Sequence, residues 1–266
     1  MTDAAFFHAL ADAAERETLP RFRAGTTVAN KKRGGFDPVT EADREAERAM
    51  CAMIEARFPD HAIVGEEFGP TDGEREWTWV LDPIDGTRAF VSGLPVWGTL
   101  IGLYRNGRPH AGMMAQPFTK ERFWSVGAGS QARWHGRDRR LVTSAVTALA
   151  DATLMTTDPR LFGDGERAAF RRLEGAVRMS RYGCDCYAYA MVAAGEVDLV
   201  VESGLQLYDI AALIPVIEGA GGVVTAWDGG DAGRGGRVVA AANATLHAAA
   251  LSVLERTGAG HEGVEG

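Results

Sequence analysis

The sequence predicts a layered α/β protein, and three observations lead to this fold class. The region before Pro59 carries two stretches with helical spacing of apolar side chains. From His61 the pattern changes to short apolar segments broken by Gly and Pro, which is typical of strands. Beyond about residue 140, strand and helix patterns alternate. With 266 residues, of which 46% are hydrophobic, the chain can bury a large core in one layered domain or in two packed halves.

Two amphipathic helices are expected in the first region. Residues 3–22 show apolar side chains near helical spacing, with acidic residues early and Arg late, as the helix dipole favours. The second helix lies in PVTEADREAERAMCAMIEARFPD, where Thr40 and Asp43 have the spacing of a capping box. Pro59 should end this helix because proline cannot continue the backbone hydrogen bonds.

Strands and helices of the remaining chain follow from its apolar segments. Four strand segments are expected first, with RNGR as a hairpin turn in the third: AIVGEE, WTWVLD, GTLIGLYRNGRPHAGMMAQP and RFWSVG. Later strands should alternate with the helical stretches ERAAFRRLEG, CYAYAMVAAG and DIAALIPVIEGAG. We therefore divide the chain into an N-terminal α+β half (1–140), a C-terminal α/β half (141–256) and a Gly-rich flexible tail (257–266).

Charge and cysteine content indicate which binding partners and which cellular compartment to expect. The formal charge of −8 argues against nucleic acid and against an anionic membrane surface, although bound cations could still attract a small anion. Cys51, Cys184 and Cys186 are too few for a disulfide framework, which indicates reduced thiols and the cytoplasm. The first residues contain early acids and no long apolar run, so we expect neither a signal peptide nor a membrane span.

The tract WTWVLDPIDGT carries the clearest chemical signal. An apolar strand leads to Asp82, Pro83 interrupts its ladder, and Asp85 follows, so two carboxylates leave one strand end together. The kinked backbone can add the Ile84 carbonyl, and Mg²⁺ prefers such oxygen ligands. Gly86 then allows close backbone approach at a turn that could bind phosphate. The alternative is that the two aspartates only end a strand and cap a turn.

Other carboxylates also lie at the ends of expected elements. Glu66 and Glu67 follow the strand segment AIVG, where they could be either functional or a solvated pair. Asp43 is explained locally by its capping box, and Asp209 could be the N-cap of the next helix. Each residue has a structural explanation by itself, so their joint occurrence is what indicates a multi-metal site.

These motifs resemble one known family over residues 3 to 255. DPVTEADREAE, VGEEFG, WVLDPIDGT and the later YD before IEGAGG are similar to the inositol monophosphatase superfamily. The resemblance implies an αβαβα sandwich, commonly a homodimer, that hydrolyses small phosphate monoesters with two or three Mg²⁺ ions per site. In that family Glu66, Asp82 and the Ile84 carbonyl would hold one metal, and Asp82, Asp85 and Asp209 would hold a second.

The resemblance also implies roles around the phosphate. Asp43 would pair with Thr87 to activate the attacking water, and Gly86 and Thr87 would bind the phosphate. Glu66 would also help to hold a third, weaker metal through water. Lys32 aligns with a basic residue near the site.

The substrate is indicated by residues away from the metals. DGTRAF looks like the histidinol-phosphate phosphatase branch, because inositol phosphatases usually have DGTTNF, and this makes Arg88 a candidate substrate contact. Histidinol phosphate carries an ammonium and an imidazole, for which Asp185 and Glu202 are candidate acceptors. Asp185 could instead be a helix N-cap and Glu202 a surface residue at a sheet end. Tyr187 and Tyr189 are interpreted as packing residues, with an aromatic wall beside the imidazole as the alternative.

Competing functions stay open at this stage. An inositol-1-phosphate or broad sugar phosphatase shares the whole metal core, and a nucleotide bisphosphatase is a weaker choice. A non-catalytic regulatory homologue would have lost a metal carboxylate or Thr87, and the sequence keeps them all. Tyr208 stands where many inositol phosphatases have Trp, a difference in the pocket wall next to a retained metal ligand.

Overall fold

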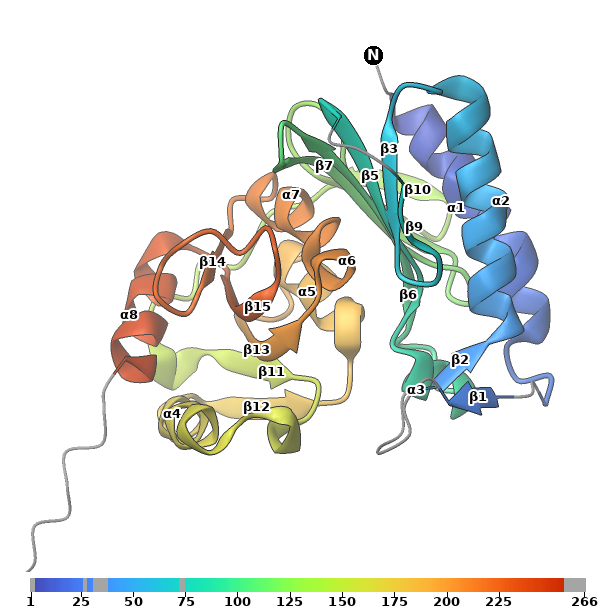
Figure 1. Ribbon diagram of the computed structural model, residues 1–266. Coiled ribbons are helices and arrows are strands. Elements are labelled where there is room, and N and C mark those ends of the chain that lie inside the picture. The colour runs from blue at the N-terminus through green and yellow to red at the C-terminus, as the bar shows by residue number, and fades with distance from the viewer. Residues whose placement is uncertain (1–2, 26–27, 31–37, 72–74, 256–266) are drawn as a thin grey trace, which may run out of the picture.

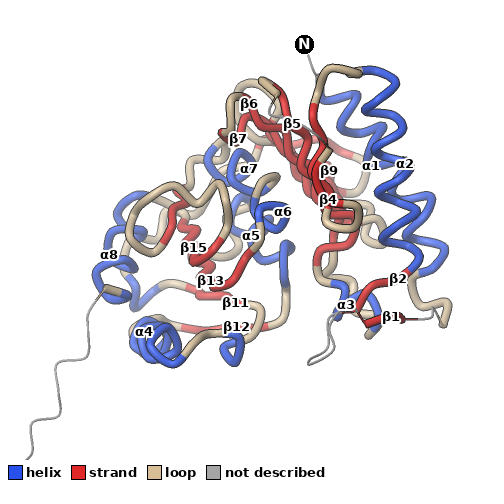
Figure 2. Tube along the Cα trace, viewed as in Figure 1, coloured by secondary structure: helices blue, strands red, loops and turns tan. Residues whose placement is uncertain are grey.

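The structure is a computed structural model that describes residues 3–25, 28–30, 38–71 and 75–255. Its elements form five layers in the order helix, sheet, helix, sheet, helix (Figure 1). Figure 2 shows the same alternation, with two separate groups of strands and helices between and outside them. The αβαβα fold class is therefore confirmed. The expectations for Lys32 and for the tail 257–266 lie outside the described residues.

The first layer consists of two helices, α1 (Ala4–Thr18) and α2 (Glu41–Arg57), with a 3-10 turn, η1 (Leu19–Arg21), after the first. Asp3 caps α1 by accepting a hydrogen bond from Phe6 N. Thr40 and Asp43 form the expected capping box at the start of α2. Beside α2 lies a small antiparallel pair of strands, β1 (Val28–Asn30) and β2 (Pro38–Thr40).

The second layer is an eight-stranded sheet with the order β10-β9-β8-β7-β6-β5-β3-β4. Only the β3–β5 pair is parallel, and this pair brings the ends of β3 and β5 to the same edge. The strands are β3 (Ala62–Gly65), β4 (Gly69–Pro70), β5 (Trp77–Asp85), β6 (Gly98–Arg105), β7 (Arg108–Gln116), β8 (Glu121–Ser125), β9 (Gln131–Trp134) and β10 (Arg137–Arg140). The helices α1 and α2 bury one face of this sheet.

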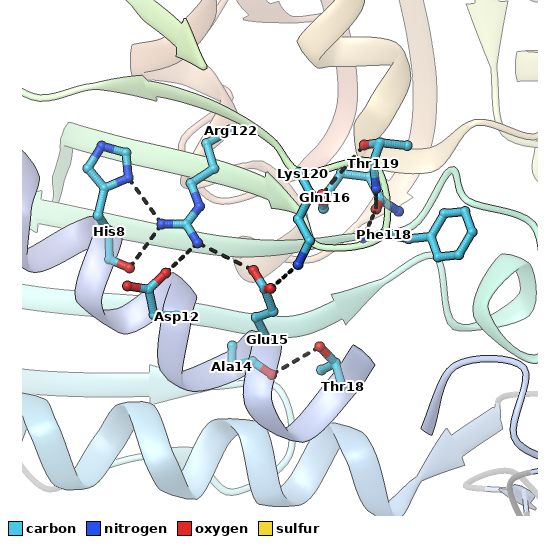
Figure 3. A network of polar contacts seen from close by, with 10 residues as sticks. All are labelled: His8, Asp12, Ala14, Glu15, Thr18, Gln116, Phe118, Thr119, Lys120 and Arg122. Atoms are coloured by element: carbon cyan, nitrogen blue, oxygen red, sulfur yellow. Dashed lines mark hydrogen bonds and ion pairs between the residues drawn. The ribbon is translucent and has the colours of Figure 1, made fainter. Parts of the chain in front are cut away.

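A polar network ties α1 to strand β8 of the same sheet (Figure 3). The Arg122 guanidinium on β8 donates to the His8 carbonyl at 3.2 Å and pairs with Asp12 at 2.5 Å and Glu15 at 3.4 Å. Lys120 also pairs with Glu15. Because these groups are mostly surface charges, the network mainly orients α1. The burial of the apolar face of α1 against the sheet supplies most of the free energy that holds the helix in place.

The middle layer contains α5 (Asp185–Ala193), α6 (Leu207–Ile210) and α7 (Leu213–Glu218), which pack between the two sheets. Two glycines of the large sheet allow a close approach. A Cβ on Gly102 would lie 2.9 Å from the Ala211 Cβ, and one on Gly112 would lie 2.1 Å from the Ala212 carbonyl oxygen. The segment between α6 and α7 therefore sits directly on strands β6 and β7.

The fourth layer is a five-stranded sheet with the order β12-β11-β13-β15-β14, whose outer face is covered by α4 (Asp164–Glu174) and α8 (Ala244–Leu254). Its strands are β11 (Thr153–Thr156), β12 (Met179–Tyr182), β13 (Leu199–Leu205), β14 (Val223–Ala226) and β15 (Gly236–Ala241). Two 3-10 turns, η2 (Leu149–Asp151) and η3 (Pro159–Leu161), flank β11. The division placed near residue 140 falls at the end of β10, on the connection to this sheet.

Most of the expected elements are present, with one correction. The hairpin turn between β6 and β7 has positive φ at both Asn106 and Gly107, as its sequence indicates. The expectation of a single helix from Asp209 was wrong, because the chain forms two short helices, α6 and then α7. Pro215, in the first turn of α7, cannot donate to the carbonyl of Ala211 and its ring crowds that carbonyl, so the interruption falls at Ala211 and Ala212. No helix in the described ranges is long and apolar enough to cross a membrane.

Candidate active site

The acidic tract ends β5 in a kink that is held by local hydrogen bonds. Ile84 N donates to Asp82 Oδ1 at 3.1 Å, and Thr87 Oγ1 donates to the Ile84 carbonyl at 3.1 Å. The pairing of β5 with β6 shifts register between Asp82 and Asp85. Pro83 has no N–H for the ladder, which explains why regular pairing stops there. The kink also brings the short helix α3 (Thr87–Val91) directly after the strand.

Three carboxylates meet at this strand end. Asp82, Asp85 and Asp209 each offer an oxygen, and the three oxygens lie within 4.8 Å of one another. Asp209 comes from the third position of α6, where its Oδ2 accepts a hydrogen bond from Gln206 N at 2.6 Å. Gln206, and not Asp209, is therefore the N-cap. Asp85 Oδ2 accepts from Cys186 N at the start of α5 at 2.6 Å. Clustered carboxylate oxygens suit a hard cation such as Mg²⁺.

The electrostatics of the cluster point to the same chemistry. Burial raises the pKa of Asp82 and of Asp85 well above the usual range, and neighbouring carboxylates raise both further, Glu66 most for Asp82 and Asp185 most for Asp85. Burial likewise raises the pKa of Asp209 to about 7. In the protein alone the ionised forms are thus disfavoured, and a divalent cation among them would reverse that preference. The donor set fits a metal ion.

Glu66 reaches the cluster from the loop after β3. Its backbone N donates to strand β5 at 3.1 Å, and its carboxylate lies near enough to raise the pKa of both Asp82 and Asp209. The loop is held from the other side by Glu47, which is 1% exposed. The two Glu47 oxygens accept from Glu67 N at 2.9 Å and from Phe68 N at 3.0 Å.

Asp43 lies buried at the start of α2. Its Oδ2 accepts from Thr40 N at 2.8 Å and from Thr40 Oγ1 at 2.6 Å. Burial raises the pKa of Asp43 to about 7, although the Thr40 hydrogen bonds oppose this. The preceding residue, Ala42, shares a core cluster with Ile84 at the end of β5, so the start of α2 lies beside the kink. The pairing of Asp43 with Thr87 stays a prediction, since the Thr87 hydroxyl here donates to the Ile84 carbonyl.

A cavity of about 300 Å³ opens beside the cluster. Predicted site residues that line it are Asp85, Gly86, Thr87, Arg88, Asp185, Glu202 and Asp209. Asp43, Asp82 and Ile84 are buried and do not line it. The fold thus brings most of the predicted phosphate-binding and substrate-binding residues to the walls of one cavity.

Asp185 occupies an unusual position in this cavity. The N-cap interpretation was wrong, because Cys184 is the N-cap and Asp185 is the first residue of α5, with φ of 43°. A Cβ on Gly86 would lie 3.1 Å from the Asp185 side chain, so glycine at 86 lets the carboxylate approach the tract. Burial raises the pKa of Asp185 to about 6, and the nearby Arg88 guanidinium opposes this rise.

Glu202 is a buried residue of β13 and not a surface residue, with 4% exposure. Its Oε1 accepts from Thr157 N at 2.6 Å, and burial raises its pKa to about 7. Tyr187 packs as expected, with its hydroxyl donating to Glu121 at 2.7 Å. Sequence reasoning missed Thr157 and treated Tyr189 as packing, yet both line the cavity. The spacing of Tyr189, one helical turn after Asp185, was the available signal.

Comparison with known proteins defines the class. The model of the inositol monophosphatase family matches residues 2–259, and the chain belongs to this family. Its members are phosphatases that act on phosphoric monoesters and depend on a metal, generally Mg²⁺. The clustered carboxylates of Asp82, Asp85 and Asp209 agree with this dependence.

Particular relatives carry different names within that family. The chain is 43% identical to the bifunctional phosphatase IMPL2, chloroplastic, of Arabidopsis thaliana, over 95% of this chain and 75% of the relative. It is 38% identical to a histidinol-phosphatase of Mycobacterium tuberculosis, over 92% of this chain and 95% of the relative. Among solved structures, an inositol monophosphatase from Zymomonas mobilis superposes with a TM-score of 0.85 at 40% identity, covering 95% of this chain and 97% of the other.

Proposed function

We propose that this protein is a Mg²⁺-dependent histidinol-phosphate phosphatase of histidine biosynthesis. One observation carries the proposal: a single cavity joins the carboxylates Asp85 and Asp209 to two further carboxylates, Asp185 and Glu202, on its walls. The first pair suits a cation, and the second pair suits a leaving group that is itself positively charged. The hydroxyls of a neutral polyol could also donate to these carboxylates, but only a cationic leaving group would add charge pairing to those hydrogen bonds.

The metal ligands in this proposal are those of the sequence analysis. Glu66, Asp82 and the Ile84 carbonyl would hold one Mg²⁺, and Asp82, Asp85 and Asp209 a second, with a third and weaker ion beside Glu66. Bound Mg²⁺ would neutralise phosphate oxygens, make a water more acidic and stabilise the leaving oxygen. The close spacing of the Asp82, Asp85 and Asp209 oxygens supports this assignment.

The chain's own groups would orient the reaction. The Gly86 and Thr87 backbone would face the phosphate, and Asp43 with Thr87 would hold the attacking water and take its proton. The water oxygen forms a bond to phosphorus, the bond from phosphorus to the ester oxygen breaks, and that oxygen gains a proton to give L-histidinol. Asp43 suits the role of proton acceptor, because burial raises its pKa to about 7.

The leaving group would be recognised by Asp185, Glu202 and Arg88. Asp185 and Glu202 would accept hydrogen bonds from the ammonium and the imidazole. Arg88, which lies close to Asp185, would keep that carboxylate ionised and positioned. Charge-assisted hydrogen bonds of this kind contribute about 1.5–3 kcal/mol each, enough to choose between substrates.

The relatives support this choice and also a second candidate. The histidinol-phosphatase of Mycobacterium tuberculosis matches nearly the whole chain and supports the first choice. The inositol monophosphatase from Zymomonas mobilis matches a similar share of the chain with similar identity and supports the second. Hydrolysis of inositol 1-phosphate is therefore the second candidate. We also propose a homodimer in the cytoplasm. The free thiols of Cys51, Cys184 and Cys186 support a reducing compartment.

Phosphate release from L-histidinol phosphate and from myo-inositol 1-phosphate should be measured side by side, with Mg²⁺ and with EDTA. We expect kcat/KM to favour L-histidinol phosphate by about tenfold or more, as even one extra charge-assisted hydrogen bond of about 1.5 kcal/mol would give. EDTA should stop both reactions. Faster turnover of the inositol ester would overturn the proposal in favour of the second candidate.

A further inference from the structure

Tyr189 has a buried hydroxyl with no hydrogen-bond partner. The residue is 3% exposed, and its Oη has no partner in the described part of the chain. Buried side-chain polar atoms in proteins almost always have a partner. A hydroxyl left unpaired at the wall of a cavity therefore indicates a water molecule or a bound ligand as its partner.

Tyr189 lies in the wall of the cavity, beside the residues that would receive the leaving group. Tyr189 follows Asp185 by one helical turn on α5, and both residues line the cavity together with Glu202. Burial raises the pKa of Tyr189 well above its usual range, and the nearby Glu202 carboxylate raises it further. The side chain is consequently a neutral phenol that can both donate and accept a hydrogen bond.

The other tyrosine of α5 provides a contrast. Tyr187 donates its hydroxyl proton to Glu121 on β8 at 2.7 Å, and its ring meets Phe123 edge-on at 6.3 Å between centroids. Its hydroxyl is therefore paired within the protein, on the side of the large sheet. Of the two tyrosines, only Tyr189 lines the cavity, and only Tyr189 has an unpaired hydroxyl.

We propose that the Tyr189 hydroxyl is a specificity contact that forms a hydrogen bond with a nitrogen of the substrate's leaving group. This inference rests on the proposed function and extends it from two carboxylates to a third group. A phenol can donate to a bare imidazole nitrogen or accept from a protonated one, so it suits the ring in either form. A leaving group that cannot form this bond would leave the hydroxyl unpaired, which is how buried polar groups reject analogues.

The test compares Tyr189→Phe with the matched control Tyr187→Phe. Both keep the ring, and each removes one hydroxyl from the same helix. Substrates are L-histidinol phosphate and phenyl phosphate, whose leaving group has no nitrogen. For Tyr189→Phe we expect kcat/KM for L-histidinol phosphate to fall about tenfold, mainly through KM, and that for phenyl phosphate to stay within about twofold. Its Tm should be equal to or above that of the wild type, because no protein hydrogen bond is lost.

The control should behave in the opposite way. Tyr187→Phe removes a paired hydroxyl, so its Tm should fall while the ratio of the two kcat/KM values stays at the wild-type value. Calorimetric titration with L-histidinol gives an independent measure, and Tyr189→Phe should weaken its binding by about tenfold.

Several results would overturn the inference. They are equal losses on both esters with Tyr189→Phe, an unchanged substrate ratio, or a lower Tm with an unchanged ratio, which would mean a structural role. Failure of the proposed function has a different signature, since it is seen in the wild type as faster turnover of myo-inositol 1-phosphate. That result overturns both proposals, whereas the results for Tyr189→Phe bear only on the second.

Discussion

Glu47 should control the position of the loop that carries Glu66, although it is not itself expected to touch a metal. Its two oxygens accept the backbone N–H groups of Glu67 and Phe68 at 2.9 and 3.0 Å. Glu47→Ala leaves both donors without their acceptor. Hydrogen bonds to a charged group contribute about 1.5–3 kcal/mol each. The loss is partly offset, because the variant no longer has to desolvate a buried carboxylate. We expect the free energy of unfolding to fall by about 2–4 kcal/mol.

The functional consequence should appear in metal affinity. Residues that orient metal ligands typically change affinity by about 10–100-fold when removed, so Glu47→Ala should weaken Mg²⁺ binding by at least about tenfold. Urea unfolding and calorimetric Mg²⁺ titration measure the two effects. Glu45→Ala, which removes a surface carboxylate paired with Arg48 on the same helix, is the matched control and should change stability by less than about 0.5 kcal/mol. Equal Mg²⁺ affinity in the two variants would refute the role of Glu47.

Gly65→Ala tests the same contact between Glu47 and the loop, this time with a substitution at the start of the loop. A Cβ on Gly65 would lie 1.8 Å from Glu47 Oε1, a severe overlap with a buried carboxylate. Gly65→Ala should therefore destabilise the wild type strongly but cost much less when Glu47 is already alanine. Such a cycle should show a coupling of about 1–3 kcal/mol between the two sites. Additive effects would mean that the loop does not depend on the Glu47 carboxylate.

The remaining predictions concern the cluster and the cavity. Asp82→Asn should abolish turnover and weaken Mg²⁺ binding while circular dichroism shows an intact fold, and retained activity would contradict the metal assignment. Asp185→Asn and Glu202→Gln should lower kcat/KM for L-histidinol phosphate by about tenfold or more while affecting phenyl phosphate less, and equal losses on both esters would count against a substrate role. The raised pKa of Asp209, about 7, predicts that the metal-free fold loses stability as pH rises from about 4 to 7, because the folded state keeps a proton that the unfolded chain has released. Mg²⁺ needs the ionised form, so its increment in Tm should be larger at pH 8 than at pH 6, and a pH-independent increment would contradict this reasoning.

Local features of this protein could be predicted from sequence because their causes lie within a few residues. The capping box of Thr40 and Asp43, the hairpin at Asn106 and Gly107 and the kinked end of β5 all depend on neighbouring side chains and backbone geometry. Apolar patterns likewise indicated α1, α2, α4, α5 and the strands β3, β5 to β8 and β11 to β14, whereas α8 and the strands β9, β10 and β15 were not predicted. The candidate ligands were found by motif, and their grouping into one site came from the family resemblance and not from spacing alone.

Tertiary structure decided which of these groups meet. Asp209 approaches Asp82 and Asp85 because α6 packs between the sheets, where Gly102 and Gly112 let the chain lie directly on β6 and β7. The place of Tyr189 in the cavity wall depends on the same packing, and apart from its spacing from Asp185 nothing local distinguishes it from a core residue. Contacts across more than a hundred residues depend on how the layers dock, whereas capping and turn geometry depend only on adjacent backbone.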